Sequence, residues 1–187
     1  MKTIAGDEPW QQWGADYFRA LSTFGALQDS TIRSLLQTGK VMELSRGEVL
    51  YRPGDKTVGF YVILKGTIAL YMHHHDRDAL TRLYRTGEQL GFVDMIGLHD
   101  RWSTSVAQEP TVLVDISTDQ FYELHLSAPD DFGLLMINLS REMARTVITL
   151  AEVIVDQSVL IATGRQDEGG GRKPRDSVAP ADVDNKR

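Results

Sequence analysis

The feature that most limits the fold of this chain is a series of short apolar runs between residues 41 and 116, separated by Gly, Pro and Asp. The runs are four to eight residues long and rich in β-branched or aromatic side chains, which is typical of strands. In chain order they read VMEL, EVLYR, GFYVILKG, TIALYM, LTRLYR, TSVAQ and TVLVDI. Several short strands at nearly even spacing predict a sandwich or a barrel-like sheet.

Helical periodicity flanks this stretch on both sides. Apolar side chains recur at helical spacing between residues 10 and 37. The helical period returns at Thr118 and continues without Gly or Pro after Gly133. The expected organisation is therefore N-terminal helices over residues 1–40, a β-roll over 41–117, C-terminal helices over 118–163 and a disordered, Gly-rich and charged tail over 164–187.

Composition excludes several classes of function. The chain has 187 residues, no cysteine and a net charge of −6. Without cysteine there is no disulfide, thiolate metal site or cysteine nucleophile. An acidic balance argues against an autonomous nucleic-acid-binding protein, because a phosphate backbone requires a basic face. We expect a cytoplasmic protein with no membrane contact, because no apolar run reaches the roughly 18 residues of a span and the N-terminus lacks the apolar core of a signal peptide.

The long C-terminal helix is predicted to carry two adjacent apolar stripes. One stripe contains Met136 and the other Ile137, and both continue at spacings of three, four or seven residues. Such a helix can pack on its own domain and on a partner at once, which predicts a homodimer. The alternative is a single broad stripe against one large core. The expected dimer contacts are Met143, Val147, Leu150, Ile154 and Ile161.

Two motifs near the start of the strand region carry a family resemblance. They are GEVLYRPGD at residues 47–55, with a tight turn at Pro53-Gly54-Asp55, and FYVILKG at residues 60–66. Together with the order of elements, they resemble the cyclic nucleotide-binding domain, and more specifically the sensor half of the CRP/FNR-like regulators. The resemblance implies an α+β, mainly β fold. Its core is a β-roll, or jelly roll, flanked by helices and followed by a long dimerisation helix.

The same resemblance implies a phosphate-binding cassette at residues 90–105. In the family a short helix opens with F-G-E, whose Glu binds the ribose 2′-hydroxyl, and an Arg about ten residues later binds the cyclic phosphate. Here Gly91 matches, Phe92 replaces the Glu, and Arg101 is the candidate phosphate ligand. The candidate ligand-binding residues are Gly91, Phe92, Val93, Arg101, Trp102, Ser103 and Thr104.

The cassette departs from the family pattern in ways that weaken nucleotide binding. A ribose hydroxyl facing Phe92 would lose its acceptor, at a cost of roughly 1–3 kcal/mol. Asp94 is expected to point elsewhere on its helical turn. Trp102 is interpreted as a plug that fills the pocket together with Phe92, with a stacking surface for a flat ligand as the alternative. The GFVDMIG run resembles the FNR branch, whose iron–sulfur cluster needs cysteines that this chain lacks.

The resulting functional hypothesis is a non-enzymatic regulatory module that senses a small ligand through a degenerate pocket and signals by protein–protein contact. The ligand stays open: the family implies a cyclic nucleotide, and haem near His99 is the alternative. The sequence is also compatible with a ligand-free interaction module whose pocket is filled, and with the sensor half of a DNA-binding regulator. We expect no direct DNA binding, because nothing after Gly164 can form a recognition helix. No catalytic set is visible.

The sequence His73-His74-His75 invites a metal-binding interpretation. Neighbouring residues on a strand point to opposite faces, so three in a row do not converge on one ion. We therefore predict a solvated hairpin turn and no metal site.

Overall fold

The computed structural model describes residues 1–74 and 77–169, with side chains described for residues 1–73 and 77–159. The chain divides into two compact units, residues 1–145 and residues 146–187. Of the predicted tail, residues 170–187 lie outside the described residues. Residues 164–169 continue the last helix, which corrects the predicted boundary at Gly164, because Arg165, Gln166 and Glu168 all favour helix.

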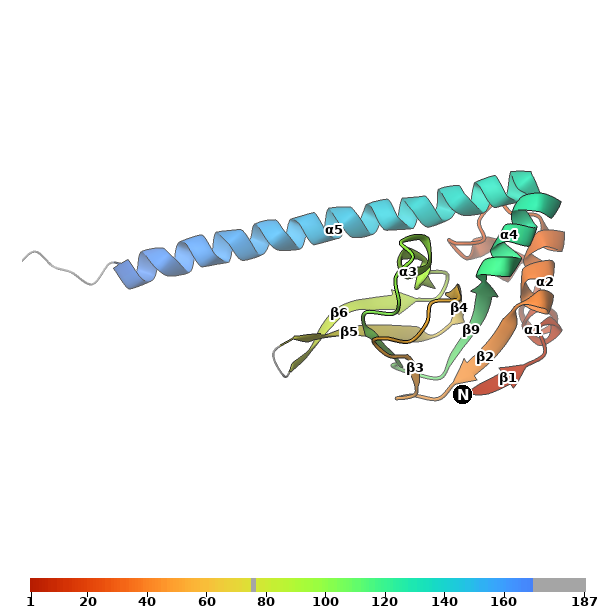
Figure 1. Ribbon diagram of the computed structural model, residues 1–187, viewed down its shortest axis with the longest axis horizontal. Coiled ribbons are helices and arrows are strands. Elements are labelled where there is room, and N and C mark those ends of the chain that lie inside the picture. The colour runs from red at the N-terminus through yellow and green to blue at the C-terminus, as the bar shows by residue number, and fades with distance from the viewer. Residues whose placement is uncertain (75–76, 170–187) are drawn as a thin grey trace, which may run out of the picture. The chain divides into compact units, whose positions relative to one another are not determined.

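Two antiparallel sheets form the centre of the first unit, and their strands confirm the predicted mainly β fold (Figure 1). The five-stranded sheet has the order β1 (Lys2–Ile4), β2 (Lys40–Leu44), β9 (Thr111–Ser117), β4 (Gly59–Lys65) and β7 (Gln89–Leu90). The four-stranded sheet has the order β3 (Val49–Tyr51), β8 (Thr104–Ala107), β5 (Thr67–His74) and β6 (Arg77–Arg85).

The prediction for residues 1–40 contained helices and no strand, so strand β1 was not predicted. It pairs antiparallel with β2, with Thr3 opposite Met42. A three-residue strand is too short to produce a periodic apolar pattern. It forms because the edge of β2 offers hydrogen-bond partners to its backbone.

Alternation along the strands separates two cores. In β4, Phe60, Val62 and Leu64 belong to the core beneath the helices, whereas Tyr61 and Ile63 contribute to the core inside the roll. Successive side chains of a strand point to opposite faces, so both faces of this central strand are covered. The core inside the roll takes residues from both sheets, namely Met42, Leu44, Tyr51, Ile63, Ile68, Leu70, Leu90, Ala107 and Leu113.

Helices before and after the strands cover the five-stranded sheet. They are α1 (Asp7–Ala20), which is interrupted at Gly14 with φ 76°, α2 (Asp29–Thr38), α4 (Thr118–Ser127) and the first part of α5 (Pro129–Gly169). A capping box between Ser117 and Gln120 starts α4. The short helix α3 (Phe92–Ile96) lies between β7 and β8.

Within the first unit, α5 buries a stripe other than the two predicted. Leu135 and Leu139 are fully buried, and Glu142 is 7% exposed. These positions lie one residue before the expected Met136–Met143 stripe. Met143, predicted to contact a partner, is partly buried against the chain's own core. The helix faces the sheet with the neighbouring stripe, and the contact of Met143 with a partner stays a prediction.

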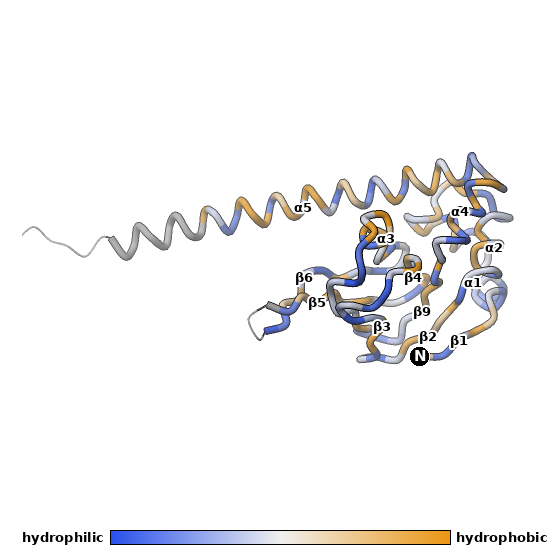
Figure 2. Tube along the Cα trace, in the orientation of Figure 1, coloured by the Kyte–Doolittle hydropathy of each residue, from blue (hydrophilic) through white to orange (hydrophobic). Residues whose placement is uncertain are grey.

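The second unit contains the rest of α5, along which apolar and polar residues alternate (Figure 2). All its described side chains from 147 to 159 are exposed. The large apolar ones are Val147, Ile148, Leu150, Val153, Ile154, Val155 and Val159. Ile161 lies on the helix, but its side chain is outside the described part of the chain. Among the described helices, none combines the length and apolar character of a membrane span.

The predicted turn at Pro53-Gly54-Asp55 has the expected geometry. Gly54 has φ 89°, and the Asp55 N–H donates to the Arg52 carbonyl across Pro53-Gly54 at 3.2 Å. His73 and His74, predicted to lie in a hairpin turn, instead belong to the end of β5, where His73 Nδ1 is 3.0 Å from Asp78 Oδ1 of β6. His75 is outside the described residues. Within the described ranges, no group of three or more His, Asp or Glu side chains could hold a metal ion.

Candidate functional site

The cassette begins where β7 turns sharply into α3. Gly91 connects them with φ 80°, in the left-handed region that favours glycine. A Cβ at this position would overlap the guanidinium of Arg101. The turn at Gly54-Asp55 fixes the other end: the Arg101 N–H donates to the Asp55 carbonyl at 2.9 Å, and the Gly54 N–H donates to the Arg101 carbonyl at 2.7 Å. The GEVLYRPGD motif and the cassette glycine therefore both help to position Arg101.

The side chain of Arg101 is buried and is bound by groups of this chain. Its Nη1 donates to Asp94 Oδ2 at 3.1 Å and to the Gly91 carbonyl at 3.0 Å. Its Nη2 donates to the Gly59 carbonyl at 2.8 Å. The Arg101 and Asp94 side chains are 1% and 5% exposed, so this ion pair is almost completely removed from water. The Nε of Arg101 is buried without a hydrogen-bond partner.

Two tyrosines from the sheets flank the guanidinium of Arg101. Its Cζ lies 4.7 Å from the ring centroid of Tyr51 and 5.3 Å from that of Tyr61, within the range of cation–π attraction. Burial raises the pKa of Tyr51, against the lowering effects of the Arg101 charge and a hydrogen bond with Ser103. Burial also raises the pKa of Tyr61. Both phenols therefore stay neutral, and Asp94 supplies the negative charge that faces Arg101.

Asp94 also binds Trp102, and this contact corrects two expectations. The indole Nε1 of Trp102 donates to Asp94 Oδ1 at 2.6 Å, so each carboxylate oxygen has a partner. Asp94 therefore points toward Arg101 and not elsewhere. Trp102 is 49% exposed, so it is not a buried plug. It covers the ion pair from the solvent side through its N–H group.

Phe92 does not face Arg101. It is 1% exposed and belongs to the core beneath the helices, with its ring centroid 5.4 Å from that of Phe60 and 5.9 Å from that of Phe121. The interpretation that it fills the ligand pocket is therefore wrong. The position that holds a ribose-binding Glu in the family is here part of the hydrophobic core.

The remaining predicted site residues lie on both sides of this cluster. Val93 is 52% exposed on α3, Ser103 is buried, and Thr104 begins β8 opposite Tyr71. The structure thus brings together Gly91, Arg101, Trp102 and, through Tyr51, Ser103. His99, the candidate for haem, is exposed. Sequence reasoning missed Asp94, Tyr51 and Tyr61, although an acid three residues after the cassette glycine was a signal for the first.

Comparisons with known proteins show which proteins this chain resembles. Residues 41–128 match the family model described as "Cyclic nucleotide-binding domain". A cyclic nucleotide-binding domain from Methylobacillus flagellatus KT superposes with a TM-score of 0.72 at 18% identity, covering 83% of this chain and 88% of that one. The catabolite activator protein of Thermus thermophilus gives 0.60 at 21% identity, covering 74% and 62%. Residues 41–128 thus match this family model, and the solved structures share the fold.

Among curated proteins, a lysophospholipase NTE1 from Cryptococcus neoformans var. neoformans serotype D is 30% identical over 88 residues, or 47% of this chain and 5% of the relative. The chain spans 5% to 10% of the length of the curated relatives that it matches. The similarity is thus confined to a small part of each relative. It does not carry their catalytic activity to this chain.

Proposed function

We propose that this chain is a non-enzymatic regulatory module of the cyclic nucleotide-binding fold that works without a cyclic nucleotide. The buried Asp94–Arg101 ion pair carries the proposal. In the family an Arg at this position binds the cyclic phosphate, and in this chain the carboxylate of Asp94 stands where that anion would bind. Asp94, which is part of the module itself, thereby holds the module in one arrangement.

The energetics of the site support this proposal. A nucleotide would have to displace Asp94 and leave a buried carboxylate without its cation, a situation that costs several kcal/mol. It would also compete with two carbonyl acceptors of Arg101, those of Gly91 and Gly59. Phe92 stands at the position of the family's ribose-binding Glu, but it is packed in the core beneath the helices and offers no acceptor to a ribose.

We further propose that the output is a protein–protein contact made by a homodimer. The exposed apolar residues of α5 beyond Arg145 support this, because seven large apolar side chains in 13 residues exceed what an isolated helix leaves in water. Their spacing, with Val147, Leu150 and Ile154 at intervals of three and four residues, suits a helix–helix seam with a second copy.

The proposed role of Asp94 is tested with Asp94→Asn and inorganic phosphate. This change keeps the size of the side chain and removes its charge, so that Arg101 retains an unneutralised positive charge. We expect phosphate, added at constant ionic strength, to raise the melting temperature of the variant and not that of the wild type. At 100 times the dissociation constant the rise is on the order of 5 °C.

The matched control is Asp100→Asn, in the loop that follows α3. Asp100 pairs with Lys56 at the surface, where its side chain is 48% exposed. This control removes the same charge without uncovering Arg101, so it should respond like the wild type. A phosphate response that is equal in wild type and Asp94→Asn, or absent in both, would contradict the proposal.

A further inference from the structure

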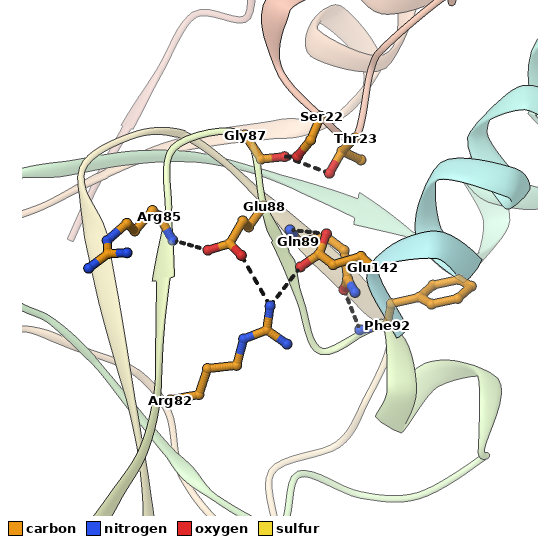
Figure 3. Close-up of polar contacts among 9 residues, drawn as sticks. All are labelled: Ser22, Thr23, Arg82, Arg85, Gly87, Glu88, Gln89, Phe92 and Glu142. Carbon is orange, nitrogen blue, oxygen red and sulfur yellow. Dashed lines mark hydrogen bonds and ion pairs between the residues drawn. The ribbon is translucent and has the colours of Figure 1, made fainter. Parts of the chain in front are cut away.

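A second, partly buried polar cluster joins α5 to the strand that leads into the cassette (Figure 3). At its centre, Glu142 of α5 accepts hydrogen bonds from Arg82 Nη2 through Oε1 at 3.3 Å and from the Gln89 N–H through Oε2 at 3.3 Å. Arg82 Nη2 also donates to Glu88 Oε1 at 3.1 Å. Figure 3 shows the guanidinium of Arg82 between the carboxylates of Glu88 and Glu142. One acidic side chain of α5 therefore holds β6 and β7 together.

The contacts continue from Glu142 to the cassette through Gln89. The side-chain Oε1 of Gln89 accepts from the N–H of Phe92, the first residue of α3, at 3.3 Å. Gln89 is 4% exposed, so neither bond has much competition from water. Two residues further along α3 lies Asp94. These hydrogen bonds therefore link Glu142 to the helix that carries the counterion of Arg101.

The charges around Glu142 come from every element packed against it. Arg82 lies on β6, with its Cζ 4.3 Å from the ring centroid of Tyr84, Glu88 lies in the turn before β7, and Arg145 lies on α5 itself. Burial is the largest effect on the pKa of Glu142 and raises it, and Glu88 adds to the rise. The Gln89 N–H, Arg82 and Arg145 oppose it, and the pKa is raised to about 7.

We propose that Glu142 makes a proton-sensitive contact, and that its charge determines how firmly α5 is attached to β7, the strand that enters the cassette. The ionised carboxylate forms the ion pair with Arg82 and accepts from the Gln89 N–H. Proton uptake removes the charge that attracts Arg82 and leaves Glu88 as its acidic partner, but it also ends the burial of a charge, which is the larger effect. The attachment is therefore firmer when Glu142 is protonated. This inference concerns the attachment of α5 and stands independently of whether Asp94 excludes a nucleotide.

The test is an NMR titration of the full chain between about pH 5 and about pH 9, following the side-chain carboxyl carbon of Glu142 and the amides of Gln89 and Phe92. We expect all three to shift together with an apparent pKa of about 7. In Glu142→Gln, which keeps all five histidines, the amide shifts should lose this step. Glu152→Gln, an exposed position on the same helix, should leave the step intact.

Melting temperatures measured at a series of pH values show whether protonation of Glu142 stabilises or destabilises the fold. A carboxyl whose pKa is higher in the folded state contributes stability that is complete below its unfolded pKa and is lost as the pH rises through the folded value. Relative to Glu142→Gln, the wild type should therefore lose melting temperature as the pH rises from about 5 to about 8. A Glu142 carboxyl that titrates near pH 4.5, or an amide step that survives in Glu142→Gln, would overturn the proposal. The carboxyl titration needs no variant and decides the matter even if Glu142→Gln does not fold.

Discussion

Replacing Asp94 with Ala is expected to destabilise the first unit by about 3–5 kcal/mol, the cost of leaving a buried charge without its partner. Arg101 would keep its two carbonyl acceptors and the Coulomb attraction of Asp115, but it would lose the carboxylate that forms its buried ion pair. Chemical denaturation followed by tryptophan fluorescence measures this loss. The control is Asp100→Ala, whose surface pair with Lys56 is worth at most about 1 kcal/mol.

A double-variant comparison separates the ion pair from general damage to the fold. If the loss comes from an uncompensated charge, adding Arg101→Met to Asp94→Ala should recover part of the stability, because the pair is then removed as a unit. Losses that simply add would mean that Asp94 and Arg101 act independently. The buried pair would then not be the element that fixes the cassette.

Leu150→Asp is expected to convert a dimer into monomers. Leu150 is 55% exposed in the second unit and lies between Val147 and Ile154 on the proposed seam. In a symmetric dimer the change places two carboxylates in an apolar contact, so the dissociation constant should rise by at least about 100-fold. Light scattering coupled to size-exclusion chromatography measures the mass directly.

Thr149→Asp is the matched control for that experiment, since Thr149 lies on the polar face with Glu152 and Asp156. It adds the same charge one residue away and should leave the mass of the dimer unchanged. A wild-type chain that is already monomeric, or a Leu150→Asp chain that keeps the wild-type mass, would show that this stripe is not the interface.

The fold could be predicted from the sequence because its main signals are local. Short β-branched and aromatic runs indicated the strands, and Pro53-Gly54 indicated a turn whose geometry depends on residue type. The position of Arg101 also followed from its spacing after Gly91. Strand β1 could not be found this way, because three residues contain no period and their pairing depends on an edge formed 40 residues later.

The side-chain contacts of the site were harder to predict, because the direction of each side chain depends on how the short helix α3 is oriented. Gly91 in the left-handed region turns α3 so that Phe92 enters the core and Asp94 faces Arg101. Neither direction follows from spacing alone. Glu142 had a readable signal: it continues the stripe of Leu135 and Leu139 at intervals of four and three residues. An acid in a buried stripe indicates a polar partner there.

The central claim is that the chain's own Asp94 occupies the place of the anion at Arg101. Isothermal titration calorimetry of the wild-type chain with cyclic AMP, cyclic GMP and cyclic di-GMP tests it most directly. We expect no saturable binding at nucleotide concentrations up to about 1 mM, the range in which an unhindered site would bind measurably. A saturable heat with any of the three that disappears in Arg101→Ala would contradict the account and make this domain a nucleotide sensor.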